Sequence, residues 1–363
     1  MQRNILLVHN AYRIAGGEDT AFKDDLNFRE KKGCNVFTYL RSNSEIDEMG
    51  LFEKLLLPFS AIFSFKTYRE VKALIKEKKI EKVYVHNTWL LISPSVFYAC
   101  FSCHVPVTLR AHNYRLLCPA ATFYRRGHGV CEECVSCGLG CALKHNCYRG
   151  NTPETLMMTA GMWVHRLLHT YKRVHISALT DFMKEKLILH PDIDEKNVSV
   201  RGNRIYADLS AVNGKKADPY FIFVGRLSEE KGIMTLLEAY KKYTEGGTDN
   251  DIKLIVCGEG MLSDKCETFV RDNRIKGVSF TGFISHEEIL KDIKGAKAVI
   301  VPSLWYEGYP MVIAEAHALG TKVVGSDIGS VASLLDKRNG DVSFAAGDAD
   351  DLCHKLSDAA FKE

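Results

Sequence analysis

Short apolar runs alternate along the chain with longer segments in which apolar residues recur every three or four positions. The short runs are typical of strands buried on both faces, and the periodic segments are typical of amphipathic helices. Their alternation predicts parallel sheets covered by helices. The predicted strands are Asn4–His9, Cys34–Tyr39, Lys82–His86, Val105–Arg110, Arg173–Ser177, Asn197–Val200, Tyr220–Val224, Lys253–Cys257, Val278–Thr281, Ala298–Val301, Lys322–Gly325 and Asp341–Phe344. The predicted helices are Asp19–Lys31, Tyr68–Lys79, Pro153–Tyr171, Asp181–Leu189, Ile233–Tyr243, Leu262–Asn273, His286–Ile293, Pro310–Leu319, Ser330–Leu335 and Ala349–Ala360.

These elements form two sets, and each set predicts its own doubly wound α/β sheet. Between the sets lies Arg204–Pro219, a weakly periodic stretch with Asn, Gly, Lys and Pro that is typical of a linker. A length of 363 residues also favours two domains, at roughly 150 residues per domain. We therefore predict an N-terminal domain over residues 1–204 and a C-terminal domain over residues 205–363, with a cysteine-rich insert at residues 118–147.

The composition is that of an ordinary globular protein, 46% hydrophobic and 26% charged, which excludes collagen, coiled coil and disorder. The charge is divided unevenly. Residues 1–210 hold 29 Lys+Arg and 21 Asp+Glu, a balance of +8, whereas residues 211–363 hold 19 and 24, a balance of −5. The basic first half is expected to meet an anionic partner, unless it is simply a solvated basic face.

No targeting or membrane-spanning segment is expected. The apolar run at the start, Ile5–Val8, is too short for the core of a signal peptide. The longest uncharged apolar stretch, Leu55–Phe65, contains Pro58 and falls short of the about 20 residues that a transmembrane helix needs. We therefore expect a cytoplasmic protein whose cysteines are reduced.

Because ligands of open α/β sheets bind at the carboxyl ends of the strands, the loops after strands are where chemistry is expected. The first strand is followed by Gly16 and Gly17 and then by a helix. Glycines there let backbone N–H groups approach an anion at a helix N-terminus. The spacing is not that of the dinucleotide motif, and the alternative is an ordinary turn with Asp19 as the helix cap.

The first strand of the second half ends at Gly225, and two cations, Arg226 and Lys231, precede the helix that follows. Cations at a helix N-terminus are unfavourable, so their presence predicts an anion such as a diphosphate. Arginine can bind phosphate oxygens bidentately, and lysine acts as a point charge. The alternative is surface pairing with Glu229 and Glu230.

Two carboxylates accompany the predicted helix Pro310–Leu319. Glu307 lies in the Gly/Pro loop before the helix, and Glu315 lies among apolar residues within it. A continuous helix would separate them by about 12 Å, which exceeds the spacing of glycosidase carboxyl pairs. They are expected to contact two ends of a long ligand, unless Glu315 binds a neighbouring residue or faces solvent.

Together these residues resemble the family-4 retaining glycosyltransferases of GT-B fold, which have two Rossmann-like domains facing across a cleft. The matching stretches of the second half are Gly225-Arg226-Leu227 with Lys231-Gly232, Gly258-Glu259-Gly260, Phe280–Ile284, and Glu307 and Glu315 after Pro302-Ser303. Those of the first half are Gly16-Gly17, Val85-His86-Asn87, Thr108–Asn113 and Gly202-Asn203.

The resemblance implies a role for each matching residue. Arg226 and Lys231 would neutralise the donor diphosphate, and Glu315 would hold the ribose hydroxyls. His112 would lie beside the anomeric centre. The catalytic residues implied are His112, Glu307, Arg226 and Lys231. The donor-binding residues implied are Gly16, Gly17, Arg226, Lys231, Glu259, Phe283, Gly308, Tyr309, Pro310, Met311, Val312 and Glu315.

The activity implied is transfer of a hexose from a nucleotide diphosphate sugar, with retention of configuration, to a saccharide or lipid-linked acceptor in surface polysaccharide biosynthesis. Fixed positive groups would stabilise the leaving diphosphate between the two domains, so no catalytic cofactor is expected. Chains of this fold usually continue past the last helix and cross back onto the first domain, whereas this one stops at Glu363. A truncated chain, or domain closure by other contacts, is therefore expected.

Six of the twelve cysteines lie in the insert, in the order C-x2-C-x2-C-x3-C-x5-C after Cys118. Such spacing is typical of tetrahedral zinc, and the resemblance implies Cys118, Cys131, Cys134 and Cys147 as a structural zinc set. An insert without metal is an equal alternative. An iron–sulfur cluster is less favoured because Ala142 replaces the usual proline.

The apolar stretch Leu55–Phe65 is followed by a basic helix. That combination suits an anionic membrane surface and predicts peripheral association. The alternative is a helix that faces the core and has a solvated basic side. The basic residues are Lys66, Arg69, Lys72, Lys76, Lys78 and Lys79.

Two other functions would account for part of the sequence. A nucleotide-sugar epimerase could use the same scaffold without an acceptor. A metal- or redox-responsive binding protein would explain the cysteines but not Arg226, Lys231, Glu307 and Glu315 together. Nucleic-acid binding is not expected, because the basic residues have neither interleaved aromatic residues nor a recognition motif.

Overall fold

The computed structural model describes residues 3–13, 16–205, 209, 212–214, 219–246 and 252–361. It has two compact units, one of residues 1–122 and 132–204 and the other of residues 123–131 and 205–363. Part of the expected linker Arg204–Pro219, and the chain end at Glu363, lie outside the described residues. Residues Phe123–Cys131 group with the second unit, whereas the sequence assigned the whole insert to the first.

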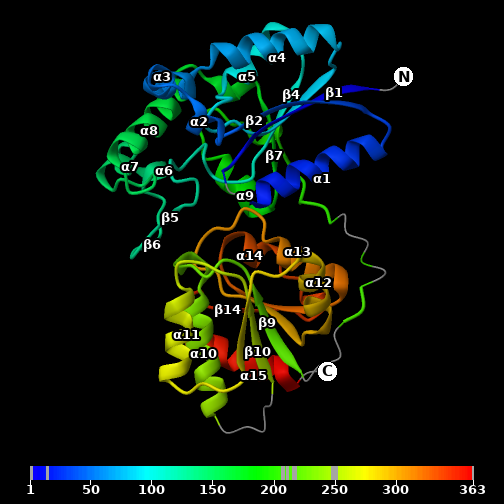
Figure 1. The fold of residues 1–363 in the computed structure, drawn as a ribbon, viewed down its shortest axis with the longest axis vertical. Helices are drawn as coiled ribbons and strands as arrows, with labels where there is room; N and C mark the ends of the chain where they lie inside the picture. The colour runs from blue at the N-terminus through cyan, green and yellow to red at the C-terminus, as the bar shows by residue number, and fades with distance from the viewer. Residues whose placement is uncertain are drawn as a thin grey trace. The chain divides into compact units, whose positions relative to one another are not determined.

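The first unit is built on a six-stranded parallel sheet in the order β2-β1-β3-β4-β7-β8 (Figure 1). Its central strand β1 is buried on both faces, which explains why its residues are apolar without alternation. The strands are β1 (Asn4–Ala11), β2 (Asn35–Ser42), β3 (Lys82–Asn87), β4 (Val107–Arg110), β7 (His175–Ala178) and β8 (Val198–Val200). The helices are α1 (Gly17–Lys31), α2 (Glu45–Glu48), α3 (Leu51–Ile62), α4 (Phe65–Glu77), α5 (Ser95–Ser102), α6 (Glu133–Ser136), α7 (Gly140–Lys144), α8 (Thr152–Leu167) and α9 (Asp181–Leu187).

The second unit has a six-stranded parallel sheet in the order β11-β10-β9-β12-β13-β14 and a two-stranded hairpin, β5-β6. The strand order reverses between β9 and β12, as in doubly wound dinucleotide folds. The strands are β5 (Tyr124–Arg125), β6 (Gly129–Val130), β9 (Tyr220–Val224), β10 (Lys253–Cys257), β11 (Val278–Gly282), β12 (Ala298–Val301), β13 (Lys322–Ser326) and β14 (Val342–Phe344). The helices are α10 (Ile233–Glu245), α11 (Ser263–Asp272), α12 (His286–Gly295), α13 (Met311–Leu319), α14 (Gly329–Leu334) and α15 (Ala349–Phe361).

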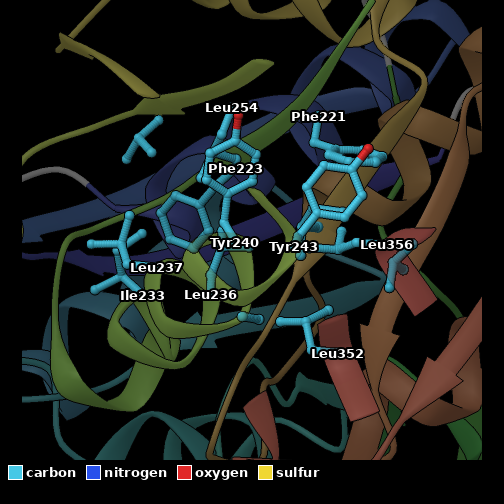
Figure 2. Packing of buried hydrophobic residues seen from close by; sticks show 14 of the residues in the cluster. Phe221, Phe223, Ile233, Leu236, Leu237, Tyr240, Tyr243, Leu254, Leu352 and Leu356 are labelled. Atoms are coloured by element: carbon cyan, nitrogen blue, oxygen red, sulfur yellow. The ribbon is translucent and has the colours of Figure 1, made fainter. Parts of the chain in front are cut away.

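Successive residues of β9 point to opposite faces of this second sheet. Because these residues are apolar on both faces, helices cover both. Phe221 and Phe223 pack with residues of α10 and α15, and Figure 2 shows Phe223 beside Tyr240 and Phe221 beside Tyr243. Ile222 belongs to the cluster on the other face, with residues of α12 and α13. The two buried layers hold the strand ends rigidly, and the loops that follow those ends carry the predicted site residues.

All the predicted strands are confirmed, with ends that differ by at most three residues. The predicted helices are confirmed as well, although α8 ends at Leu167 and not at Tyr171. The pattern missed α5, whose eight residues are almost uniformly apolar and lack a 3.6-residue period. It also missed α3, because Pro58 reads as a helix breaker and yet lies inside that helix.

Helix α3 does not face the core. Of its residues only Ala61 is buried. Leu51, Phe52, Leu55 and Phe59 are 69–81% exposed. The next helix, α4, matches the alternative of a helix that faces the core and has a solvated basic side. It buries Thr67, Val71 and Ile75 and leaves its basic side exposed. No helix within the described ranges is both long enough and apolar enough to cross a bilayer.

A close approach between two loops of the second unit requires glycine at position 232. Gly232 has φ of +69°, and a Cβ there would lie 1.8 Å from the carbonyl oxygen of Pro302. We predict that Gly232→Ala lowers the free energy of unfolding by at least about 2 kcal/mol, because it adds both a backbone clash and a strained φ.

The matched control is Gly246→Ala at the end of α10, where φ is −69° and the nearest atoms to a Cβ lie at 3.5 and 3.6 Å. It should change stability by less than about 1 kcal/mol. Urea unfolding of both variants measures the difference, and equal stabilities would contradict the close approach.

Candidate functional site

The reversal of strand order brings two site loops of the second unit together. Strand β9 ends at Val224 and leads to Arg226 and Lys231, while its neighbour β12 ends at Val301 and leads to Glu307. Ligands of doubly wound sheets bind outside the carboxyl ends of the strands at this reversal. The backbone N–H of Leu304 donates to the carbonyl of Glu230 at 2.9 Å, which joins the two loops directly.

Lys231 and Glu307 form a largely buried ion pair at this point. The Lys231 ammonium donates to both carboxylate oxygens, at 2.7 and 2.9 Å, and the Ser303 hydroxyl donates to Oε1 at 2.6 Å. Burial alone would raise the pKa of Glu307, but the Lys231 charge and these hydrogen bonds hold it below its ordinary value. Glu307 is therefore an anion that fixes the position of the ammonium.

Arg226 is more loosely held. Its guanidinium donates to Glu230 at 3.2 Å, and its side chain is 68% exposed. The alternative of pairing with nearby glutamates thus holds for Arg226 and Glu230, but Lys231 pairs across the loops with Glu307 instead. An exposed, singly bonded guanidinium keeps donors for a further anion.

The loop after Glu307 leads into helix α13. Residues Gly308, Tyr309 and Pro310 precede this helix, and Met311 and Val312 begin it. The nine-residue helix has Pro310 at its N-cap and no capping side chain. Its first N–H groups lack helical partners, and the helix dipole there favours negative charge.

Glu315 is buried on the same helix and has a partner that the sequence did not identify. Its Oε1 accepts a hydrogen bond from His286 Nε2 at 2.8 Å, and the His286 side chain is 59% exposed while that of Glu315 is 9% exposed. The apolar surroundings seen in the sequence therefore do contain a polar partner. The pair offers a carboxylate held in place beside an accessible ring.

The remaining donor-site residues of this unit lie after β10 and β11. Glu259 Oε1 accepts from the Phe283 N–H at 3.3 Å, and the Phe283 side chain is 85% exposed. A cavity of about 350 Å³ beside them is lined by Gly258, Glu259, Gly260 and Phe280, among others. An exposed aromatic ring next to a cavity can stack on a flat ring system.

In the first unit, Gly16 and Gly17 lie at the start of α1. Asp19 accepts from the Gly16 N–H at 2.8 Å, so the predicted capping role of Asp19 is confirmed. Neither glycine adopts a positive φ. Among the described residues, a Cβ at Gly17 would meet nothing within 4 Å. The protein itself therefore does not require glycine there, and the exposed backbone is open to a ligand.

His112 follows β4 and lies against a row of polar groups inside the first unit. Its Nε2 is 3.0 Å from His86 Nδ1. His86 Nε2 is in turn 3.2 Å from Asp25 on α1, which pairs with Arg29 at 2.9 Å. Burial lowers the pKa of His112 well below its ordinary value. The sequence singled out His112 but gave no indication of Asp25 as its indirect neighbour.

The structure therefore brings together Arg226, Lys231 and Glu307 in one unit, and Gly16 with Gly17 and His112 with His86 in the other. The sequence missed Ser303, His286, Asp25 and Arg29. His286 and Asp25 lie far along the chain from Glu315 and His86, so no local pattern could indicate those contacts, whereas Ser303 and Arg29 each lie four residues from their partners.

The predicted zinc set is not supported. Within the described residues, one group brings three possible ligand atoms within 4.8 Å of one another, and it consists of His128, Cys131 and Glu133. Cys134 is buried with Leu139 and Ala142 in an apolar cluster, and Cys141 and Cys147 pack against it. Of the predicted set, Cys131 belongs to that group, while Cys134 and Cys147 contribute to the apolar cluster, so the structure gives the tetrahedral zinc set no support.

Comparison with known proteins gives the second unit a family. Residues 207–360 match the family model "Glycosyl transferases group 1". This part of the chain is therefore similar to group 1 glycosyltransferase domains. It contains Arg226, Lys231, Glu307 and Glu315.

Curated relatives match over a similar stretch. An uncharacterized glycosyltransferase of Methanocaldococcus jannaschii is 35% identical over 31% of this chain and 28% of its own length. The alpha-D-kanosaminyltransferase of Streptomyces kanamyceticus is 30% identical over 36% of this chain and 33% of its own. The aligned stretch thus spans about a third of these relatives or less.

Solved structures match nearly the whole chain. The lipopolysaccharide outer core galactosyltransferase WaaB has a TM-score of 0.62 at 16% identity, over 98% of this chain and 90% of its own. HepE of Anabaena, in complex with UDP and glucose, has a TM-score of 0.64 at 14% identity, over 99% and 90%. At such identities the likeness shows the fold, which is GT-B as predicted.

The Lys231–Glu307 pair makes a pH-dependent prediction. Because the pKa of Glu307 is lowered in the folded state, its contribution is present above about pH 4.5 and is lost as pH falls through the folded value. In Lys231→Met the ammonium is gone, so burial dominates and raises the pKa of Glu307. The ionised carboxylate then destabilises the folded state instead of stabilising it. The variant should be destabilised by about 2–3 kcal/mol at pH 7 and by clearly less at pH 4.

Lys291→Met is the control, since Lys291 forms an exposed pair with Glu287 on α12. Its cost should stay below about 1 kcal/mol at both pH values. Chemical denaturation at pH 4 and pH 7 measures both variants. A Lys231→Met penalty that is independent of pH would contradict the buried pair.

Proposed function

We propose that the protein is a retaining glycosyltransferase that moves a hexose from a nucleotide diphosphate sugar to a saccharide or lipid-linked saccharide in surface polysaccharide biosynthesis. The observation that carries the proposal is the Lys231–Glu307 pair at the strand reversal of a group 1 glycosyltransferase domain. A carboxylate that orients an ammonium beside an uncapped helix N-terminus makes a site for developing negative charge.

The barrier to sugar transfer is charge separation, since the sugar gains positive character while the diphosphate gains negative charge. We assign the diphosphate to Arg226, Lys231 and the first N–H groups of α13. The guanidinium has free donors, and the ammonium is already fixed, so neither needs to reorganise during the reaction. These groups supply the positive charge that the leaving group needs, and the proposal assigns no cofactor.

The other contacts of the donor follow from the same unit. We assign the ribose hydroxyls to Glu315, whose carboxylate is held by His286. The nucleobase is assigned to the cavity lined by Glu259, with the exposed ring of Phe283 as its stacking partner, while Glu259 Oε1 holds the Phe283 N–H.

Names of related proteins support the substrate class. Structures of HepE of Anabaena hold UDP and glucose, or UDP-glucose. WaaB is described as a lipopolysaccharide outer core galactosyltransferase. A relative in Bacillus subtilis, 31% identical over 32% of this chain, is described as a putative teichuronic acid biosynthesis glycosyltransferase. Two of these names contain a hexose, glucose or galactose, and two contain a glycan, lipopolysaccharide or teichuronic acid.

A lipid-linked acceptor would also explain helix α3. Leu51, Phe52, Leu55 and Phe59 lie exposed on a helix that buries almost nothing of its own. The next helix, α4, carries Lys and Arg along its outer side. Exposed apolar side chains beside cations fit the surface of an anionic membrane, which would bring the enzyme to such an acceptor.

Donor binding provides the first test. Isothermal titration with UDP, GDP and ADP should reveal one nucleotide that binds. Glu315→Ala should weaken that binding by about tenfold, because the hydrogen bond that a ribose hydroxyl donates to the charged carboxylate is lost. Glu287→Ala on the exposed side of α12 is the matched control and should bind normally. Unchanged affinity in Glu315→Ala would remove its ribose role.

Turnover with the binding nucleotide sugar tests the reaction itself. The anomeric proton of the product, observed by NMR, should show the configuration of the donor. Lys231→Met should lower kcat by about a hundredfold or more if the ammonium stabilises the leaving group. An inverted product would overturn retention, and conversion of the nucleotide sugar without acceptor would favour an epimerase.

Membrane association has its own test. The double variant Leu55→Glu/Phe59→Glu should fold normally, since both side chains are about 70% exposed, and should lose co-sedimentation with vesicles that contain anionic lipid. Leu189→Glu, at a leucine that is 49% exposed outside α3, should still sediment. Failure of the unaltered protein to sediment at low salt would contradict the proposal.

A further inference from the structure

A chain of buried polar groups lies behind His112 in the first unit. His86 stands at the end of β3, where the strand order of that sheet reverses beside β1. Its side chain is almost fully buried, with 3% of the residue exposed. Both of its ring nitrogens are engaged, Nδ1 with His112 Nε2 at 3.0 Å and Nε2 with Asp25 Oδ2 at 3.2 Å. His86 is thus a bridge between a carboxylate and the second imidazole.

Asp25 fixes the direction of this chain. Burial by itself would raise the pKa of Asp25, but the hydrogen bonds from His86 and Arg29 and the charge of Arg29 hold it below its ordinary value. Arg29 is itself buried, donates from Nε to Asp25 at 2.9 Å, and lies over the ring of Tyr84 at 3.4 Å. Asp25 is therefore an ionised carboxylate, which can only accept hydrogen bonds.

The protons of both rings follow from that carboxylate. His86 must carry a proton on Nε2 to donate to Asp25. Burial lowers the pKa of His86, so the ring is neutral and Nδ1 has only a lone pair. His112 must then donate from Nε2 to that lone pair. The two ring planes are inclined to each other by 24°, with the ring centroids 5.2 Å apart.

We infer that Asp25 and His86 are positioning residues that hold His112 as the Nε2–H tautomer, so that its Nδ1 presents a lone pair to a sugar hydroxyl. The inference rests on the proposed function, since it gives His112 a substrate contact. A neutral imidazole with a fixed acceptor can orient a hydroxyl of the donor or of the acceptor sugar, and it cannot donate to that hydroxyl from the same atom.

The other groups around His86 do not compete for its nitrogens. His9 meets His86 edge-on, with ring centroids 6.3 Å apart, and its Nε2 bonds to Asp19 at 2.9 Å. Phe22 packs edge-on against the same ring. The packing of these rings holds His86 in one orientation. His112 therefore donates to His86, and His86 donates to Asp25.

The tautomer itself can be observed. In protein labelled with ¹⁵N-histidine, the nitrogen shifts and couplings of His112 should report a protonated Nε2 and an unprotonated Nδ1, and those of His86 should report the same tautomer. In His86→Phe, which keeps a ring in the same space, His112 should lose this single-tautomer signature. A protonated Nδ1 on His112 in the unaltered protein would overturn the inference, whatever the activity.

Kinetics separates positioning from a merely structural role. His86→Phe should lower kcat by about tenfold or more and change the KM of the donor by less than about threefold. His86→Asn places an amide oxygen near the position of Nδ1 that can accept from His112, so it should recover most of the lost kcat. His165→Phe is the control, since His165 is equally buried but bonds to Thr170 and to the carbonyl of Ile62.

The two readouts keep the inference distinct from the proposed function. If the protein lacks transferase activity while His112 shows the Nε2–H tautomer, the proposed function fails and the hydrogen-bond chain stands. If His86→Phe turns over normally, the positioning role fails and the transferase stands. The spectrum of the unaltered protein decides the tautomer even if a variant does not fold.

Discussion

The reversal of strand order in a parallel sheet is the constraint on which the site of the second unit depends. It makes β9 and β12 neighbours although more than seventy residues separate them, so the loops that leave their carboxyl ends must meet. Gly232 permits the contact because its missing side chain leaves room for the carbonyl of Pro302. Lys231 then reaches Glu307, and an ammonium that would be unfavourable beside a helix N-terminus is held by a buried carboxylate.

The same rule operates in the first unit with different chemistry. There the reversal lies between β1 and β3, and the side chains at the strand ends are His9 and His86. Helix α1 returns across them and supplies Asp19 and Asp25, one for each ring. Burial keeps His86 and His112 neutral, so this unit offers oriented lone pairs where the other offers fixed charge. A transferase needs both, since the leaving group is anionic and the sugars are neutral.

The predictable features were those that the local sequence pattern indicates. The strands of the two sheets follow from short apolar runs, most clearly β1, β9 and β12, because a strand buried on both faces has few positions for polar side chains. Arg226 and Lys231 stand out because cations beside a helix start are unfavourable, and Glu307 stands out as a carboxylate in the Gly/Pro loop before a helix. Helix α3 was missed because Pro58 lies inside it, and its apolar residues also face outward, opposite to the rule that the pattern assumes. The spacing of the cysteines is typical of a metal site, but it is equally compatible with packing. Cys134 lies in an apolar cluster, and Cys141 and Cys147 pack against it.

The amino-acid sequence by itself determined the two doubly wound sheets, the loops that carry chemistry and the identity of the charged residues in them. These depend on periodicity and on residue type, which are properties of neighbours along the chain. Only the tertiary structure decided which partner each side chain has. Glu307 orients Lys231, His286 holds Glu315, and Asp25 acts on His112 through His86. Hydrogen bonds and ion pairs act over a few ångströms, and proximity between distant segments exists only once the strands have been ordered within the sheet.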